Sequence, residues 1–135
     1  MKHKPLILVV DDDPEVAKML ARSLSHREFN VETTTSPAEA LELAVATTYD
    51  AALLDLVMPE LDGVALAAAL RKRIPGLVVA ILTGYGHSPL IEAARQDGVS
   101  VFKKPMAIQD VVAFLEAEIP RKIQTEDTAE VADRG

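Results

Sequence analysis

Short runs of apolar residues alternate along this chain with longer segments in which apolar residues recur at every third or fourth position. The runs predict five strands, at residues 6–10, 30–34, 51–55, 77–82 and 99–103. The runs 6–10, 51–54 and 77–82 are apolar throughout, which is typical of strands buried on both faces of a parallel sheet. The stretch 30–34 is more polar, and this composition favours a place at the edge of the sheet.

The segments between the runs carry the start and stop signals of helices. Their periodicity predicts helices over residues 14–27, from 37 onward, and over 64–73, 89–97 and 108–119. Asp13 before Pro14 can cap the first helix, and Ser36 with Glu39 forms a capping box at the second. Pro120 closes the last helix.

This alternation of strands and helices predicts a single doubly wound α/β domain. In such a domain a five-stranded parallel sheet is covered by helices on both faces. We assign residues 1–120 to the domain. Residues 121–135 are polar and aperiodic, which predicts a mobile tail.

Composition narrows the class of protein. The net charge of −7 and the aromatic content of 4% do not suit a nucleic-acid binder, which needs basic patches and often stacking rings. No apolar run approaches the roughly 18 residues of a membrane span. The basic start followed by residues 6–10 is too short for a secretion signal. The absence of cysteine fits a reducing compartment, so we expect a cytoplasmic protein.

Polar side chains collect where the predicted strands end. In an open parallel sheet, ligands bind in the crevice at the carboxyl ends of the strands. Each of these residues alone has an ordinary explanation as a helix cap, a turn former or a solvated side chain, but their convergence on one edge favours a site. The residues are Asp11, Asp12 and Asp13 after the first strand, Asp55 after the third, Thr83 after the fourth and Lys104 after the fifth.

Clustered carboxylates have a chemical consequence. A close pair repels by about 4 kcal/mol at an effective dielectric near 20, so such a cluster raises pKa values or recruits a cation. Oxygen ligands in a partly open site suit Mg²⁺. A magnesium site facing Lys104 and Thr83 matches a phosphoryl group, and Asp55 is then the natural nucleophile, forming an aspartyl phosphate.

With these residues in place, the chain from about Pro5 to Ile119 resembles the receiver domain of bacterial two-component response regulators. The resemblance is carried by five separate elements in order: Asp11-Asp12, Asp55 within Leu54–Pro59, Asp62-Gly63, Thr83-Gly84 and Lys104-Pro105. It implies a flavodoxin-like fold with strand order 2-1-3-4-5. It also implies a signalling module that catalyses only its own phosphorylation and dephosphorylation.

The resemblance further implies roles for individual residues. Asp55 would accept a phosphoryl group from a histidine kinase or a phosphotransfer protein. Asp12, Asp55 and the Val57 carbonyl would bind Mg²⁺ directly, and Asp11 mainly through water. Thr83, followed by Gly84, and Lys104 would contact the phosphoryl group, and the Lys104–Pro105 peptide would be cis. The first helix would meet the kinase, whereas the last two helices would meet a protein target or a second copy.

Several positions depart from the family's usual pattern. Val101 stands where receivers often carry the aromatic residue that reports phosphorylation, so we consider Tyr85 as a substitute reporter. Met106 replaces a common phenylalanine and can fill the same apolar space. Val57 and Tyr85 flank the acceptor without an amide or acidic group, which predicts a long-lived phosphoryl group.

Two alternative functions remain open at this point. A phosphohydrolase with an aspartyl nucleophile would need a second acid at position 57 and a cap insertion, and the chain has valine there and no room for a cap. A receiver that only binds partners would have lost an acidic or lysine position, whereas all are present. A nucleotide-binding domain is not supported because no glycine-rich phosphate loop follows a strand.

Overall fold

The computed structural model describes residues 4–84 and 89–120, which alternate between strand and helix as the sequence predicts. The elements are β1 (Leu6–Val10), α1 (Pro14–Ser25), β2 (Asn30–Thr34), α2 (Pro37–Ala46), β3 (Ala51–Asp55), α3 (Gly63–Arg73), β4 (Val78–Thr83), α4 (Pro89–Gln96) and β5 (Ser100–Lys103). Residues 108–120, here called the C-terminal helix, complete the domain. The predicted tail, 121–135, and Tyr85 lie outside the described residues.

The five strands form one parallel sheet in the order β2-β1-β3-β4-β5. This order confirms the flavodoxin-like topology, and the polar strand β2 lies at an edge as predicted. The register aligns Asp55 with Leu82, and Thr83 with Lys103. The carboxyl ends of β1, β3, β4 and β5 therefore meet along one side of the sheet.

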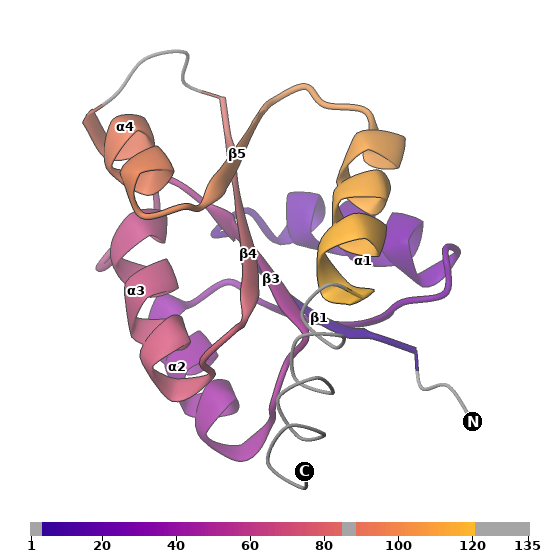
Figure 1. Ribbon diagram of the computed structural model, residues 1–135, viewed down its shortest axis with the longest axis horizontal. Helices are drawn as coiled ribbons and strands as arrows, with labels where there is room; N and C mark the ends of the chain where they lie inside the picture. The colour runs from indigo at the N-terminus through magenta and orange to yellow at the C-terminus, as the bar shows by residue number, and fades with distance from the viewer. Residues whose placement is uncertain (1–3, 85–88, 121–135) are drawn as a thin grey trace, which may run out of the picture.

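Helices cover both faces of the sheet (Figure 1). α1 and the C-terminal helix pack on one face, and α2, α3 and α4 pack on the other. Successive strand residues serve the two faces in turn: Leu8 and Val10 point into the α2–α4 layer, whereas Ile7 and Val9 point into the α1 layer. This explains why the central strands are apolar throughout, since both of their faces are buried.

Side-chain caps begin three of the helices, and two of these caps are at the predicted places. Asp13 accepts a hydrogen bond from the Glu15 N–H at the start of α1, and Ser36 accepts one from the Glu39 N–H at α2. Asp62 does the same for α3 through the Ala65 N–H. Each cap satisfies an amide that has no partner within its helix. These caps fix the point at which the chain turns from a strand end into the following helix.

The predicted boundaries are wrong by one or two residues at six elements. The helix expected over 64–73 begins at Gly63, the helix expected over 89–97 ends at Gln96, and the strand expected over 99–103 begins at Ser100. The helix expected over 108–119 also includes Pro120. The helix expected over 14–27 ends at Ser25, and the strand expected over 77–82 spans Val78–Thr83. Leu77 is not in the strand because its N–H bonds the Ile74 carbonyl in the preceding turn.

The outward face of α1 also differs from the expected pattern. Val16, Met19, Leu20 and Leu24 recur at helical spacing, which predicts that all four lie on the apolar stripe of this helix, but Met19 is 62% exposed. The buried face of α1 is formed by Ala17, Leu20 and Leu24. At 3.6 residues per turn, position 19 falls roughly opposite Ala17.

In the part of the chain that the structure describes, no helix combines the length and apolarity needed to cross a lipid bilayer.

Candidate functional site

Three consecutive aspartates at the end of β1 take three different positions. Asp11 is buried, Asp12 is exposed, and Asp13 caps α1. The Asp11 backbone N–H bonds the Thr34 carbonyl, which extends the pairing of β1 with β2 by one residue. Its Oδ1 accepts the Asp13 N–H at 2.9 Å, so the side chain is held toward the interior. The sharp bend of the chain after β1 therefore separates one buried carboxylate from one exposed carboxylate.

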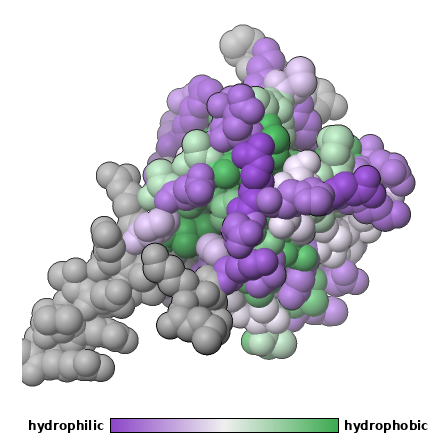
Figure 2. Space-filling model, turned by 90° about the vertical axis from the view of Figure 1, so that its right-hand side faces the viewer, coloured by the Kyte–Doolittle hydropathy of each residue, from purple (hydrophilic) through white to green (hydrophobic). Residues whose placement is uncertain are grey.

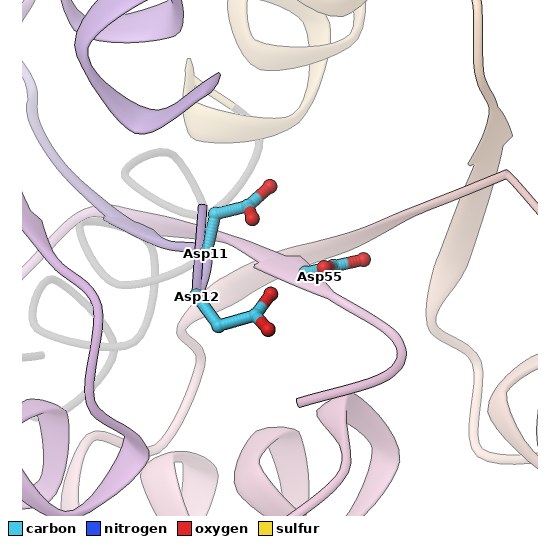
Figure 3. A group of neighbouring side chains, drawn as sticks. All are labelled: Asp11, Asp12 and Asp55. Atoms are coloured by element: carbon cyan, nitrogen blue, oxygen red, sulfur yellow. The ribbon is translucent and has the colours of Figure 1, made fainter. Parts of the chain in front are cut away.

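Asp55 at the end of β3 completes an acidic cluster with Asp11 and Asp12. One carboxylate oxygen from each residue lies within 4.8 Å of the others. Figure 3 shows the three side chains gathered at the ends of the neighbouring strands β1 and β3. Such a set of close oxygens from hard ligands is the type that binds a divalent cation in proteins. The donor set therefore fits the metal that the fold suggests.

Lys104, from the segment after β5, brings positive charge to this cluster. Its ammonium nitrogen lies 3.3 Å from Asp11 Oδ2 and 3.7 Å from Asp55 Oδ1. The backbone helps to place it, because the Lys104 N–H donates to the Thr83 carbonyl at 2.7 Å. The following peptide bond, Lys104–Pro105, is cis. Strand ends far apart in the sequence thus supply both signs of charge to one crevice.

The surroundings of Asp55 disfavour its ionised form. Burial raises the pKa of the Asp55 carboxyl from 3.8 to about 6, and the nearby charge of Asp11 acts in the same direction. The Lys104 ammonium and the Leu56 N–H oppose this rise in pKa, and Asp12 adds to it. An acid whose pKa is raised by burial and by like charges gains when a cation binds beside it.

The remaining predicted residues differ in how far they are exposed to solvent. Thr83 at the end of β4 is 1% exposed, and Gly84 after it is exposed. Val57 lies two residues past Asp55 and is 48% exposed. Val101 of β5 is half-buried and packs against the α2–α4 layer. Tyr85 and His87 lie outside the described residues.

A groove beside the charged centre was not predicted from the sequence. It has a volume of about 300 Å³ and runs between α1 and the segment after β5. Figure 2 shows the side of the molecule that lies to the right in Figure 1, where hydrophobic residues (green) lie among hydrophilic ones (purple). The lining residues are Val16, Met19, Leu20, Ser23, Lys104, Pro105, Met106 and Ile108. The sequence gives no clear signal for this groove. The spacing of apolar residues in α1 predicts that Met19 is buried in the core, whereas in the structure it is exposed and lines the groove.

The fold and the acidic site together define a class of protein, a flavodoxin-like module with a charged pocket at the strand ends. The family model of the response regulator receiver domain matches residues 7–116. The chain therefore belongs to the response regulator receiver family. This family consists typically of non-enzymatic signalling modules of two-component systems that use an aspartyl phosphate.

Relatives and solved structures agree with this assignment. The chain is 42% identical over 108 residues to the transcriptional regulatory protein GlrR of Escherichia coli, covering 78% of this chain and 24% of GlrR. It is 35% identical over 125 residues to the response regulator MprA of Mycobacterium bovis, covering 92% of this chain and 54% of MprA. It thus spans about a quarter to a half of these relatives' own length.

A similar solved structure is a response regulator protein from Burkholderia pseudomallei, determined with a phosphorylated aspartic acid, a calcium ion and citrate. It superposes with a TM-score of 0.77 at 30% identity, covering 93% of this chain and 74% of the other.

Proposed function

We propose that this receiver accepts a phosphoryl group on Asp55 and signals by changing its contacts with other proteins. The observation that carries the proposal is the meeting of Asp11, Asp12 and Asp55 with the Lys104 ammonium at one edge of the sheet. Asp55 is the carboxylate on the central strand β3, and it lies close both to the other acids and to the Lys104 ammonium. The phosphorylated aspartic acid of the related Burkholderia pseudomallei protein supports the same chemistry.

Magnesium is the cation that we assign to the cluster. Asp12, Asp55 and the Val57 carbonyl would bind it directly, and Asp11 mainly through water. The two oxygens of Asp11 already accept bonds from the Asp13 N–H and the Lys104 ammonium, which supports a less direct role. When bound, the cation would neutralise charge on the phosphoryl oxygens.

The transfer itself needs only a positioned nucleophile and a charged pocket. An Asp55 carboxylate oxygen forms a bond to phosphorus while the bond from phosphorus to the donor's histidine nitrogen breaks. The electron pair stays on the imidazole, which takes up a proton. Lys104 would pair with the new phosphoryl oxygens, and Thr83 would donate a hydrogen bond to one of them.

The groove beside α1 supports a docking site for the histidine kinase or phosphotransfer protein. It is apolar, it adjoins the pocket, and Lys104 belongs to both. A helix that presents a phosphohistidine could rest in it with its apolar face, as amphipathic helices do in grooves. Met19 and Met106 suit this role because methionine adapts to different partner surfaces.

Output would pass through the face formed by α4, β5 and the C-terminal helix, to a protein target or a second copy. Val101 occupies the position on β5 where receivers often carry an aromatic residue that reports phosphorylation. Because valine has no aromatic ring, we assign this reporting role to Tyr85. Residues 1–120 would form the whole switching unit, in the cytoplasm, with 121–135 as a tail.

Intact-mass analysis tests this function. The protein is incubated with Mg²⁺ and a small acyl phosphate, alongside Asp55→Asn and Asp13→Asn. We expect one phosphoryl adduct on the wild type and on Asp13→Asn, which keeps its helix cap, and none on Asp55→Asn. An adduct that persists on Asp55→Asn contradicts the assignment of the acceptor. A wild type that takes up no phosphoryl group indicates a module that only binds partners.

A further inference from the structure

Gly63, the first residue of α3, lies against the main chain of the proposed acceptor. A Cβ atom added at this position would meet the Asp55 carbonyl oxygen at 2.4 Å and the Leu56 Cα at 3.1 Å. Both are backbone atoms, so no side-chain rotation can make room. The close approach of α3 to the end of β3 therefore requires glycine at position 63, because any other residue would add a Cβ atom that has no room.

The same residue closes the loop that follows β3. The Gly63 N–H donates to the Leu56 carbonyl at 2.8 Å, so residues 56 and 63 hold the two ends of this loop together. Leu56 and Met58 anchor its first half, because both side chains are buried in the α2–α4 layer. Val57, whose carbonyl we assign to the metal, lies between these two anchors.

The loop also contains a strained turn. Glu60 has a φ of 75°, a left-handed conformation that costs energy for a residue other than glycine. The Leu61 N–H bonds the Pro59 carbonyl across this turn at 2.9 Å. A short loop that is bent this tightly and tied at both ends has little freedom to absorb a displacement of Gly63.

We propose that Gly63 is a positioning residue for the acceptor site, acting through the Asp55 and Leu56 backbone. It lets α3 start in direct contact with the end of β3, and this contact sets the places of the Asp55 side chain and the Val57 carbonyl. That the site binds Mg²⁺ and a phosphoryl group rests on the proposed function. The positioning role of Gly63 is a separate claim about the geometry of the loop after β3. A larger residue separates α3 from β3 and moves two metal ligands at once.

The competing explanation is that Gly63 serves only the packing of α3. A matched pair of variants separates the two. Gly63→Ala adds one methyl group beside Asp55. Ala67→Gly weakens α3 one turn further along, at a site that is 1% exposed, and adds no atom near the acceptor. Both should lower the melting temperature, but only the first should disturb the site.

Magnesium affinity, followed by amide shifts in NMR titrations, is the deciding measurement. We expect Gly63→Ala to bind Mg²⁺ about 10- to 100-fold more weakly than the wild type, the usual effect of losing a group that orients metal ligands. Ala67→Gly should bind Mg²⁺ like the wild type. Equal affinity in Gly63→Ala, or an equal loss in both variants, overturns the positioning role.

If Gly63→Ala does not fold, the Mg²⁺ titration of the wild type alone still tests the positioning role of Gly63. The Gly63 amide should then shift in step with Mg²⁺ saturation, with the same apparent affinity as the Asp12 amide. A Gly63 amide that stays constant while the Asp12 amide shifts overturns the inference alone. A wild type that binds no Mg²⁺ overturns the proposed function together with it.

Discussion

Lys104 lies closer to Asp11 than to the proposed acceptor, with its ammonium nitrogen 3.3 Å from the Asp11 carboxylate and 3.7 Å from that of Asp55. The Asp11 side chain is 3% exposed, whereas that of Asp55 is 16% exposed. The buried carboxylate of Asp11 thus holds the Lys104 ammonium at the shorter distance, whereas the Asp55 carboxylate is the one more accessible to solvent. This arrangement leaves Asp55 available to a donor while its charge is still partly balanced.

Replacing Lys104 by methionine should raise the pKa of Asp55 further, because the ammonium is the largest of the influences that lower it. Carboxyl carbon shifts in a metal-free NMR titration measure this pKa directly. Lys103→Met is the matched control, since Lys103 is exposed at the end of β5. An unchanged Asp55 pKa in Lys104→Met would show that the ion pair is too long to matter in solution. Lys104→Met should also accept the phosphoryl group more slowly.

Metal-free stability should depend on pH through Asp55. Because its pKa is raised from 3.8 to about 6, the folded state binds more protons than the unfolded state within this interval. The free energy of unfolding therefore falls as the pH rises through it, and the full penalty applies above pH 6.

Asp55→Asn cannot ionise and should escape this penalty. Above pH 6 it should be more stable than the wild type by up to about 3 kcal/mol, and the difference should vanish below pH 3.8. Denaturant unfolding with a chelator present measures both. Asp13→Asn should keep the pH dependence of the wild type. The same stability difference at both ends of the pH range would contradict the linkage.

The phosphoryl group on Asp55 should persist well beyond seconds. Val57 stands two positions after the acceptor and is 48% exposed, but it has no group that could orient or activate an attacking water. Val57→Gln should shorten the lifetime several-fold, whereas Val57→Ala, which removes bulk without adding a polar group, should leave it almost unchanged. Loss of the adduct with time, followed by intact mass, gives these rates. A wild-type lifetime of seconds without any phosphatase refutes this prediction.

Docking of the phosphodonor protein should depend on the groove beside α1. Met19 lines it and is 62% exposed, so Met19→Lys should fold normally while placing a charge on an apolar contact. Transfer from a phosphorylated donor protein should slow about tenfold or more, the cost of losing one well-placed apolar anchor. Phosphorylation by a small acyl phosphate should not change.

Val45→Lys is the matched control for this experiment. Val45 is also an exposed apolar helix residue, at 69%, but it lies on α2, in the layer on the other face of the sheet. The Val45→Lys variant should accept the phosphoryl group at the wild-type rate, both from the donor protein and from the small acyl phosphate. Equal slowing in the two variants would mean that the groove has no special part in docking.

The sequence by itself determined the alternation of elements and the residues at the strand ends. Runs such as Leu6–Val10 leave no polar face, so they require a sheet covered on both sides. Parallel topology then brings the strand ends together, so the sequence alone predicts Asp11, Asp55 and Lys104 at one edge. The strand order came from the family resemblance, because local patterns do not say which strands are neighbours.

Only the tertiary structure decided the distances and the exposures. The nearer partner of Lys104, the raised pKa of Asp55 and the groove containing Met19 all depend on how segments far apart in sequence approach one another. The requirement for Gly63 has the same origin. The dipeptide Asp62-Gly63 helps to carry the family resemblance, but the contact of α3 with the Asp55 carbonyl appears only when strand and helix are packed together. Periodicity is a property of neighbouring residues, whereas these contacts result from packing in three dimensions.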